Sequence, residues 1–65
     1  MPDADALIAQ LDRMISKMRE DLLAITASGR ADVLDPGGKE TFGEALHRRI
    51  VELQADRNAL AARHA

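Results

Sequence analysis

The sequence has 65 residues, no cysteine and one aromatic residue, Phe42. A chain of this length buries only about 60% of its unfolded surface when it folds alone, and without cysteine it has neither disulfides nor thiolate metal sites to add stability. Nine basic against eleven acidic side chains exclude a strong overall field that attracts nucleic acid or anionic membranes. We therefore expect association with another protein surface to supply the missing stability.

The start of the sequence, Met1-Pro2-Asp3-Ala4-Asp5, is acidic, whereas a secretory or mitochondrial leader is basic. No apolar run reaches the roughly 18 residues that a membrane-spanning helix needs. These two features predict a cytoplasmic protein that does not cross a membrane.

The first predicted helix covers about residues 4–28. Asp3 or Asp5 can cap its amino end, and Gly29 can adopt the left-handed conformation that ends helices. Between these limits, apolar residues recur at alternating steps of three and four, at Ile8, Leu11, Ile15, Met18, Leu22 and Ile25. This spacing is the a and d pattern of a heptad repeat. Leu7 and Met14 occupy g positions beside it and widen the apolar stripe, as in a helix of a bundle.

The predicted loop covers about residues 29–40 and contains Asp35-Pro36-Gly37-Gly38, a strong turn signal. It is longer than most helix connections in bundles. Its two strongly apolar residues, Val33 and Leu34, either fold back against Phe42 to close the end of the helix pair or form part of a binding loop. We favour closure, because exposed apolar residues at a bundle end are usually covered.

The second predicted helix covers about residues 41–63. Thr41 and Glu44 have the spacing of a capping box, in which each side chain accepts a hydrogen bond from the other residue's backbone. The seam then runs through Leu46, Ile50, Leu53, Arg57, Leu60 and His64, with Phe42 one turn earlier. Two helices of nearly equal length predict a single all-α domain over residues 1–65, folded as an antiparallel hairpin. Because two helices cannot enclose a core, we expect the hairpin to dimerise into a four-helix bundle.

Arg57 is the one charged residue in this second seam. A polar residue at an a position commonly sets the register or the oligomeric state, and a pair with Asp12 or Asp21 would satisfy it. The alternative is that Arg57 binds an anionic partner.

These patterns favour a small, non-enzymatic interaction module as the function. It would be a homo-oligomer, or an accessory or adaptor subunit that docks its apolar stripe on a larger protein assembly. The expected interface consists of Leu7, Leu11, Met14, Met18, Leu22, Ile25, Phe42, Ile50, Leu53 and Arg57. No nucleophile has an evident base near it, and Gly37-Gly38-Lys39 lacks the rest of a phosphate-binding loop, so we expect neither catalysis nor a cofactor.

Two alternative functions rest on the start of the second helix. Glu44 and His47 match the E-x-x-H spacing of metal-binding helix bundles, although their position relative to the seam directs them to solvent. His47, Arg48 and Arg49 form the main basic grouping and could contact phosphates of a nucleic acid. Acidic residues are interleaved with this grouping and no aromatic residue is present there for base stacking, so both alternatives rank below the interaction module.

Overall fold

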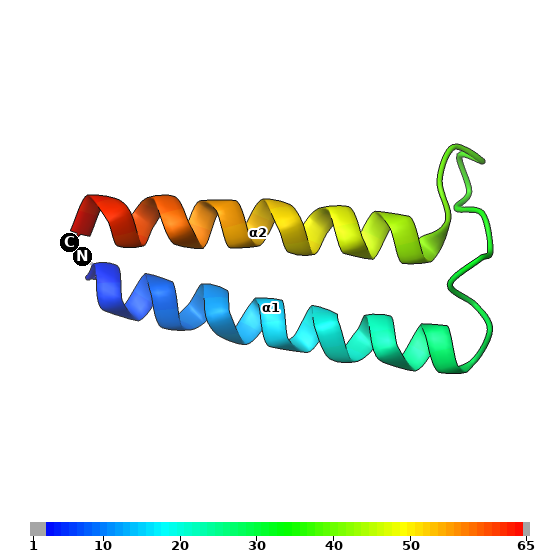
Figure 1. Cartoon of the computed structure of the whole chain (residues 1–65), viewed down its shortest axis with the longest axis horizontal. Helices are drawn as coiled ribbons and strands as arrows, with labels where there is room; N and C mark the ends of the chain where they lie inside the picture. The colour runs from blue at the N-terminus through cyan, green and yellow to red at the C-terminus, as the bar shows by residue number, and fades with distance from the viewer. Residues whose placement is uncertain (1–2, 65) are drawn as a thin grey trace.

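The computed structural model describes residues 3–64 and shows two helices, α1 (Ala4–Ala27) and α2 (Phe42–His64). The helices lie side by side in opposite directions, with the start of α1 and the end of α2 at one end of the hairpin and the connection at the other (Figure 1). The predicted all-helical hairpin is therefore confirmed for these residues. Residues 1, 2 and 65 of the expected domain lie outside the described residues. Neither helix is long and apolar enough to cross a membrane within the described part of the chain.

Both ends of α1 are closed by their local sequence. Asp3 caps the amino end, where its Oδ1 accepts a hydrogen bond of 2.7 Å from the backbone N–H of Ala6. At the carboxyl end Gly29 has a φ of 78°, a conformation that costs glycine little. The backbone N–H of Gly29 then donates to the oxygen of Thr26 (3.2 Å), and that of Arg30 donates to the oxygen of Ile25 (2.9 Å). This pair of bonds is the Schellman motif, so Gly29 ends α1 as predicted.

The amino end of α2 carries the predicted capping box. The backbone N–H of Glu44 donates to Oγ1 of Thr41 over 3.1 Å, and the backbone N–H of Thr41 donates to Oε1 of Glu44 over 3.2 Å. Two of the donors that a helix leaves unpaired at its start are satisfied in this way. The prediction of a capping box is confirmed.

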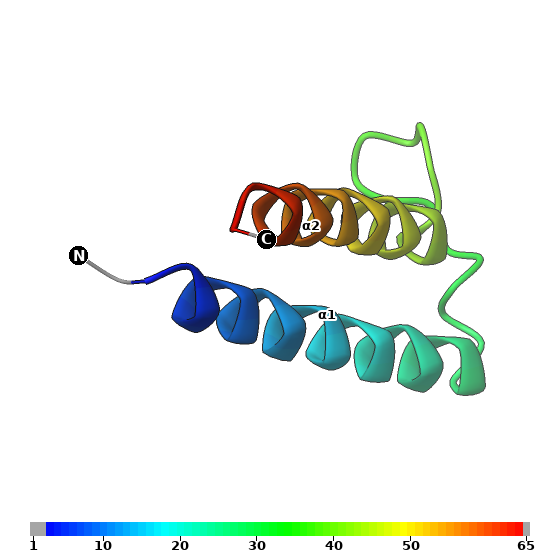
Figure 2. The same cartoon turned by 60° about the vertical axis from the view of Figure 1, so that its left-hand side comes forward.

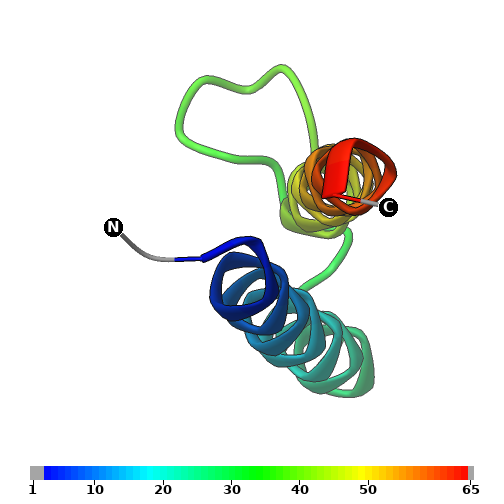
Figure 3. The same ribbon diagram turned by 90° about the vertical axis from the view of Figure 1, so that its left-hand side faces the viewer.

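The connection between the helices is structured by backbone pairing. Leu34 and Thr41 form an isolated antiparallel bridge, and the backbone N–H of Asp35 donates to the oxygen of Glu40 over 2.9 Å. Residues 35–40, which we call the loop lobe, project from the side of α2 (Figures 2 and 3). A β-carbon on Gly43 would lie 3.1 Å from the backbone oxygen of Ala31. Glycine at position 43 therefore permits the close approach of the connection to α2.

The buried core is small. The core consists of three side chains that are only 3–5% exposed to solvent, those of Ile15, Ile50 and Leu53. Three partly exposed side chains pack against them, those of Leu11, Met18 and Leu22. These residues belong to the two predicted seams, which meet between α1 and α2. Since a two-helix layer has open sides, the seams are only partly covered by each other.

Candidate functional site

One side of the hairpin is apolar and hollowed. A groove of about 430 Å³ runs between the amino half of α1 and the carboxyl half of α2, lined by Leu7, Gln10, Leu11, Met14, Asp56, Ala59, Leu60 and Arg63. A depression of about 340 Å³ lies beside it, lined by Gln10, Arg13, Met14, Lys17, Met18 and Asp21. Gln10 and Met14 line both. We call this continuous surface the apolar face.

The opposite side of the hairpin is polar. A groove of about 300 Å³ there is lined by Asp12, Ile15, Ser16, Arg19, Gln54, Arg57 and Asn58. Nε of Arg57 lies 3.1 Å from Oδ1 of Asp12. Of the two predicted partners, Asp12 and Asp21, Arg57 therefore contacts Asp12. The side chain of Arg57 is 37% exposed, and Arg57 is therefore at the edge of this groove and not within the core. An ion pair this exposed contributes at most about 1 kcal/mol.

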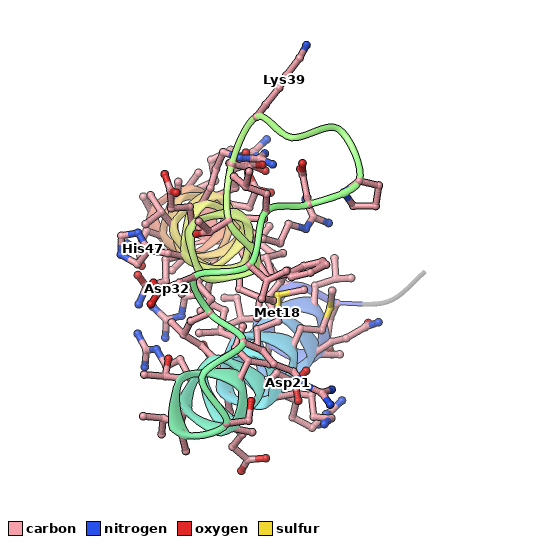
Figure 4. All side chains as sticks on the ribbon, turned by 90° about the vertical axis from the view of Figure 1, so that its right-hand side faces the viewer. Met18, Asp21, Asp32, Lys39 and His47 are labelled. Atoms are coloured by element: carbon pink, nitrogen blue, oxygen red, sulfur yellow. The ribbon has the colours of Figure 1, made fainter. Side chains whose placement is uncertain are left out.

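Figure 4 shows the two sides from the loop end. Met18 and Asp21 lie on one side of the hairpin, and His47 and Asp32 lie on the other. Lys39 extends from the tip of the loop lobe, away from both helices. The apolar face and the polar groove share no lining residue, so a partner can cover the first without occupying the second.

The nine apolar residues of the expected interface divide into three groups. Leu7, Met14 and Phe42 keep more than a third of their surface exposed, while Leu11, Met18, Leu22 and Ile25 are partly buried. Ile50 and Leu53 are buried between the helices. These last two belong to the intramolecular core, which the sequence could not distinguish from an outer interface because both use the same seam. Arg57 lies on the opposite, polar side.

Val33 and Leu34 do not close the end of the hairpin, although closure was the favoured prediction. They remain 49% and 58% exposed, and Phe42 is also exposed. The reason is the backbone pairing of the connection, in which the N–H of Phe42 donates to the oxygen of Val33 over 2.9 Å. This pairing holds the connection as a narrow ladder beside α2 instead of folding it across the helix ends.

The rim of the apolar face is charged. On α1, Nζ of Lys17 lies 2.9 Å from Oδ1 of Asp21, and both side chains are exposed. The hydrogen bond to Asp21, followed by the charge attraction, raises the pKa of Lys17. On α2, Nη1 of Arg49 lies 3.4 Å from Oε2 of Glu52. Each helix therefore presents both signs of charge beside the apolar surface.

The basic grouping at the start of α2 is held by carboxylates. Arg48 contacts Oε1 of Glu40 over 2.8 Å and Oε1 of Glu52 over 3.2 Å, and Arg49 shares Glu52. The hydrogen bond and charge attraction from Glu40, with a smaller effect from Glu52, raise the pKa of Arg48. His47 is exposed beside them. Phosphates would have to displace these carboxylates, which weakens the electrostatic attraction that nucleic-acid binding needs.

Glu44 is occupied by the capping box. Its Oε1 accepts a hydrogen bond from the backbone N–H of Thr41, and the ion pairs of Arg48 are with Glu40 and Glu52. Among the described residues, no group of three His, Cys, Asp or Glu side chains is placed to hold a metal ion. Glu44 and His47 thus lack further ligands in that part of the chain.

Sequence reasoning missed two exposed apolar residues, Leu23 and Val51, which are 71% and 51% exposed. Leu23 follows Ser16 by seven residues, and Val51 precedes Asn58 by seven, so both lie on the side of the polar groove. Each lies one position after a seam residue, at a b position of the heptad. The large apolar residues of the apolar face, in contrast, occupy d and g positions. The heptad pattern carries no signal for them.

Comparison with the models of known protein families, with curated proteins and with solved structures finds no match to this chain. The function must therefore be inferred from the hairpin's own surfaces.

Proposed function

We propose that this chain is a small, non-enzymatic interaction module that works by burying its apolar face against another protein surface. Leu7 and Met14 lie on that face beside the partly buried Leu11 and Met18. Burial of such side chains provides about 25 cal/mol for each Å² of apolar surface removed from water. Methionine side chains adapt to the shape of a partner, which suits two of these four positions.

The observation that carries the proposal is the amount of surface that the hairpin leaves exposed. Its accessible surface is 4836 Å², whereas a compact monomer of 7.1 kDa exposes about 4,100 Å². The hairpin thus exposes roughly 750 Å² more surface to water than a compact monomer of the same mass. The hairpin therefore has the surface expected of part of a larger assembly.

Two forms of association are compatible with this role. The chain can pair with itself to form a four-helix bundle, or it can act as an accessory or adaptor subunit of a larger protein assembly. The proposal includes the cytoplasmic location expected from the sequence. It includes neither a metal nor a nucleic acid, because Glu44 and Arg48 already have partners within the hairpin.

The proposal is tested by placing charges on each side of α1. Leu7→Glu with Met14→Glu puts two carboxylates on the apolar face, and Ser16→Glu with Leu23→Glu puts two on the opposite side of the same helix. Light scattering and circular dichroism report mass and helix content. We expect the first pair to abolish association and the control pair to preserve it. A wild-type chain that is a stably folded monomer, with a helix content that neither pair changes, would contradict the proposal.

A further inference from the structure

We propose that the occupant of the apolar face is a second copy of this chain, related by a two-fold axis parallel to the helices. In this dimer α1 of each copy packs antiparallel against α2 of the other, and both connections lie at the same end. The inference rests on the proposed function and adds the identity and the orientation of the partner.

The size of the hairpin fits a second copy. Its radius of gyration is 14.2 Å, whereas a compact domain of 65 residues has a radius of about 10.7 Å and one of twice that length about 14 Å. The surplus surface of roughly 750 Å² is close to the about 800 Å² that each partner buries in a standard interface. A second hairpin has the same 40 Å length, so it can extend along the apolar face and pair with both helices.

The charges on the rim select the orientation. Asp12 contacts Arg57 across the hairpin, so a residue i of α1 lies level with about residue 69 − i of α2. Rotation about an axis parallel to the helices preserves this level, because it moves no atom along the axis. The rim of α1 in one copy then lies beside the rim of α2 in the other, at matching heights.

At those heights, opposite charges face each other. The rim of α1 carries Arg13, Lys17 and Asp21 in this order. The residues of α2 level with Arg13 and Lys17 are Asp56 and Glu52, and the residue level with Asp21 is Arg48, directly before Arg49. Asp56 lines the groove of the apolar face, Glu52 precedes the groove residue Ala59 by seven positions, and Arg49 precedes Asp56 by seven. Positive, positive and negative on α1 therefore meet negative, negative and positive on α2.

Two of these six charges have no ion-pair partner among residues 3–64. Within the described part of the chain, neither Arg13 nor Asp56 forms an ion pair, whereas Lys17 pairs with Asp21 and Arg49 with Glu52 on their own helices. In the proposed dimer Arg13 and Asp56 face each other across the interface. The two intrahelical pairs come together there as an alternating set of four charges.

The competing arrangement has its two-fold axis perpendicular to the helices, so that α1 packs against α1 of the other copy. With the helices fully overlapped, the level of Lys17 in one copy coincides with that of Met14 in the other, and Arg13 coincides with Met18. Lys17 and Arg13 then face methionines and Asp21 faces Gln10, so the three rim charges of α1 are level with no residue of opposite sign. Charge complementarity thus favours the axis parallel to the helices.

The test uses two charge reversals, Arg13→Glu and Asp56→Arg. Each variant alone places like charges opposite each other at both symmetry-related contacts, and we expect its dimer to dissociate about tenfold more readily. In a mixture, the heterodimer has opposite charges at both contacts. Native mass spectrometry of an equimolar mixture should show well over the statistical half of the dimers as heterodimers. A mixture of Arg19→Glu with wild type, altered only at the polar groove, should give the statistical half.

A cross-linking measurement covers the case in which either reversal unfolds the chain. The sequence contains no cysteine, so Asp21→Cys and Arg49→Cys each provide a unique thiol. A short bismaleimide should link these two variants to each other in a mixture and link neither to itself.

The outcomes separate this inference from the proposed function. If the chain dimerises, but the two charge-reversal variants form only the statistical half of heterodimers and the Asp21→Cys and Arg49→Cys variants are not cross-linked to each other, the inferred arrangement is wrong. The proposed interaction module is then unaffected. A partly helical monomer overturns the second copy as partner but not the module. A fully folded, stable monomer contradicts both.

Discussion

Met14 provides the most direct estimate of what the apolar face contributes. Its side chain is 37% exposed in the isolated hairpin. Since complete burial of a methionine contributes about 1.5–3 kcal/mol, the exposed part still accounts for roughly 0.5–1 kcal/mol. A two-fold dimer contains this side chain twice. Met14→Ala should therefore weaken association by about 1–2 kcal/mol, which is roughly a 5- to 30-fold increase in the dissociation constant.

Leu23→Ala is the matched control for this substitution. It also removes a large apolar side chain from α1 and replaces it with the same residue, but Leu23 lies on the side of the polar groove and is 71% exposed. Sedimentation equilibrium of the three proteins gives their dissociation constants. We expect the control to match wild type within about twofold, since exposed substitutions usually change free energies by less than 0.5 kcal/mol. Equal dissociation constants for Met14→Ala and wild type would refute the reasoning.

Three further predictions concern the fold and its charges. Leu53→Ala should lower the free energy of unfolding by about 2–4 kcal/mol in urea, because Leu53 is only 3% exposed; a loss below 1 kcal/mol would place Leu53 outside the core. Thr41→Ala should cost about 1 kcal/mol by removing the hydroxyl that accepts from Glu44, and unchanged amide exchange at Glu44 would count against this role. The pair of Lys17 with Asp21 raises the pKa of Lys17, so its contribution is complete below about pH 10.4 and is lost as the pH rises through the raised value. NMR titration should show a lower Lys17 pKa in Asp21→Asn, and an unchanged value would contradict the contact.

The ends of both helices could be predicted from the sequence because they depend on local chemistry. Asp3 caps α1, Gly29 ends it with a positive φ, and Thr41 and Glu44 form the capping box of α2. Each of these signals requires only residues that lie within a few positions of one another. The antiparallel arrangement then follows from two seams of equal length joined by a turn.

The distribution of residues between core and surface could not be predicted in the same way. The heptad pattern assigned Ile50, Leu53 and Arg57 to one stripe, but the first two are buried between the helices and the third is half-exposed beside Asp12. The rotation of each helix about its own axis decides this distribution. That rotation depends on contacts between α1 and α2, which are remote in sequence.

The connection was the least predictable element. Its turn residues were recognised, but the exposed positions of Val33 and Leu34 were not. Backbone bonds from Asp35 to Glu40 and from Phe42 to Val33 determine their placement, and such bonds have no signature in side-chain polarity. The apolar character of Val33 and Leu34 predicted that they are buried, but the backbone pairing of the connection leaves both side chains exposed to solvent.

The central claim is that the isolated hairpin is only part of the stable particle. Sedimentation equilibrium of the wild-type chain tests it most directly, recorded by interference because the chain has neither Trp nor Tyr, with thermal unfolding followed at the same concentrations. We predict a mass that rises toward twice 7.1 kDa and an unfolding midpoint that rises with concentration. A mass of 7.1 kDa at every concentration, with full helix content and a constant midpoint, would contradict the account.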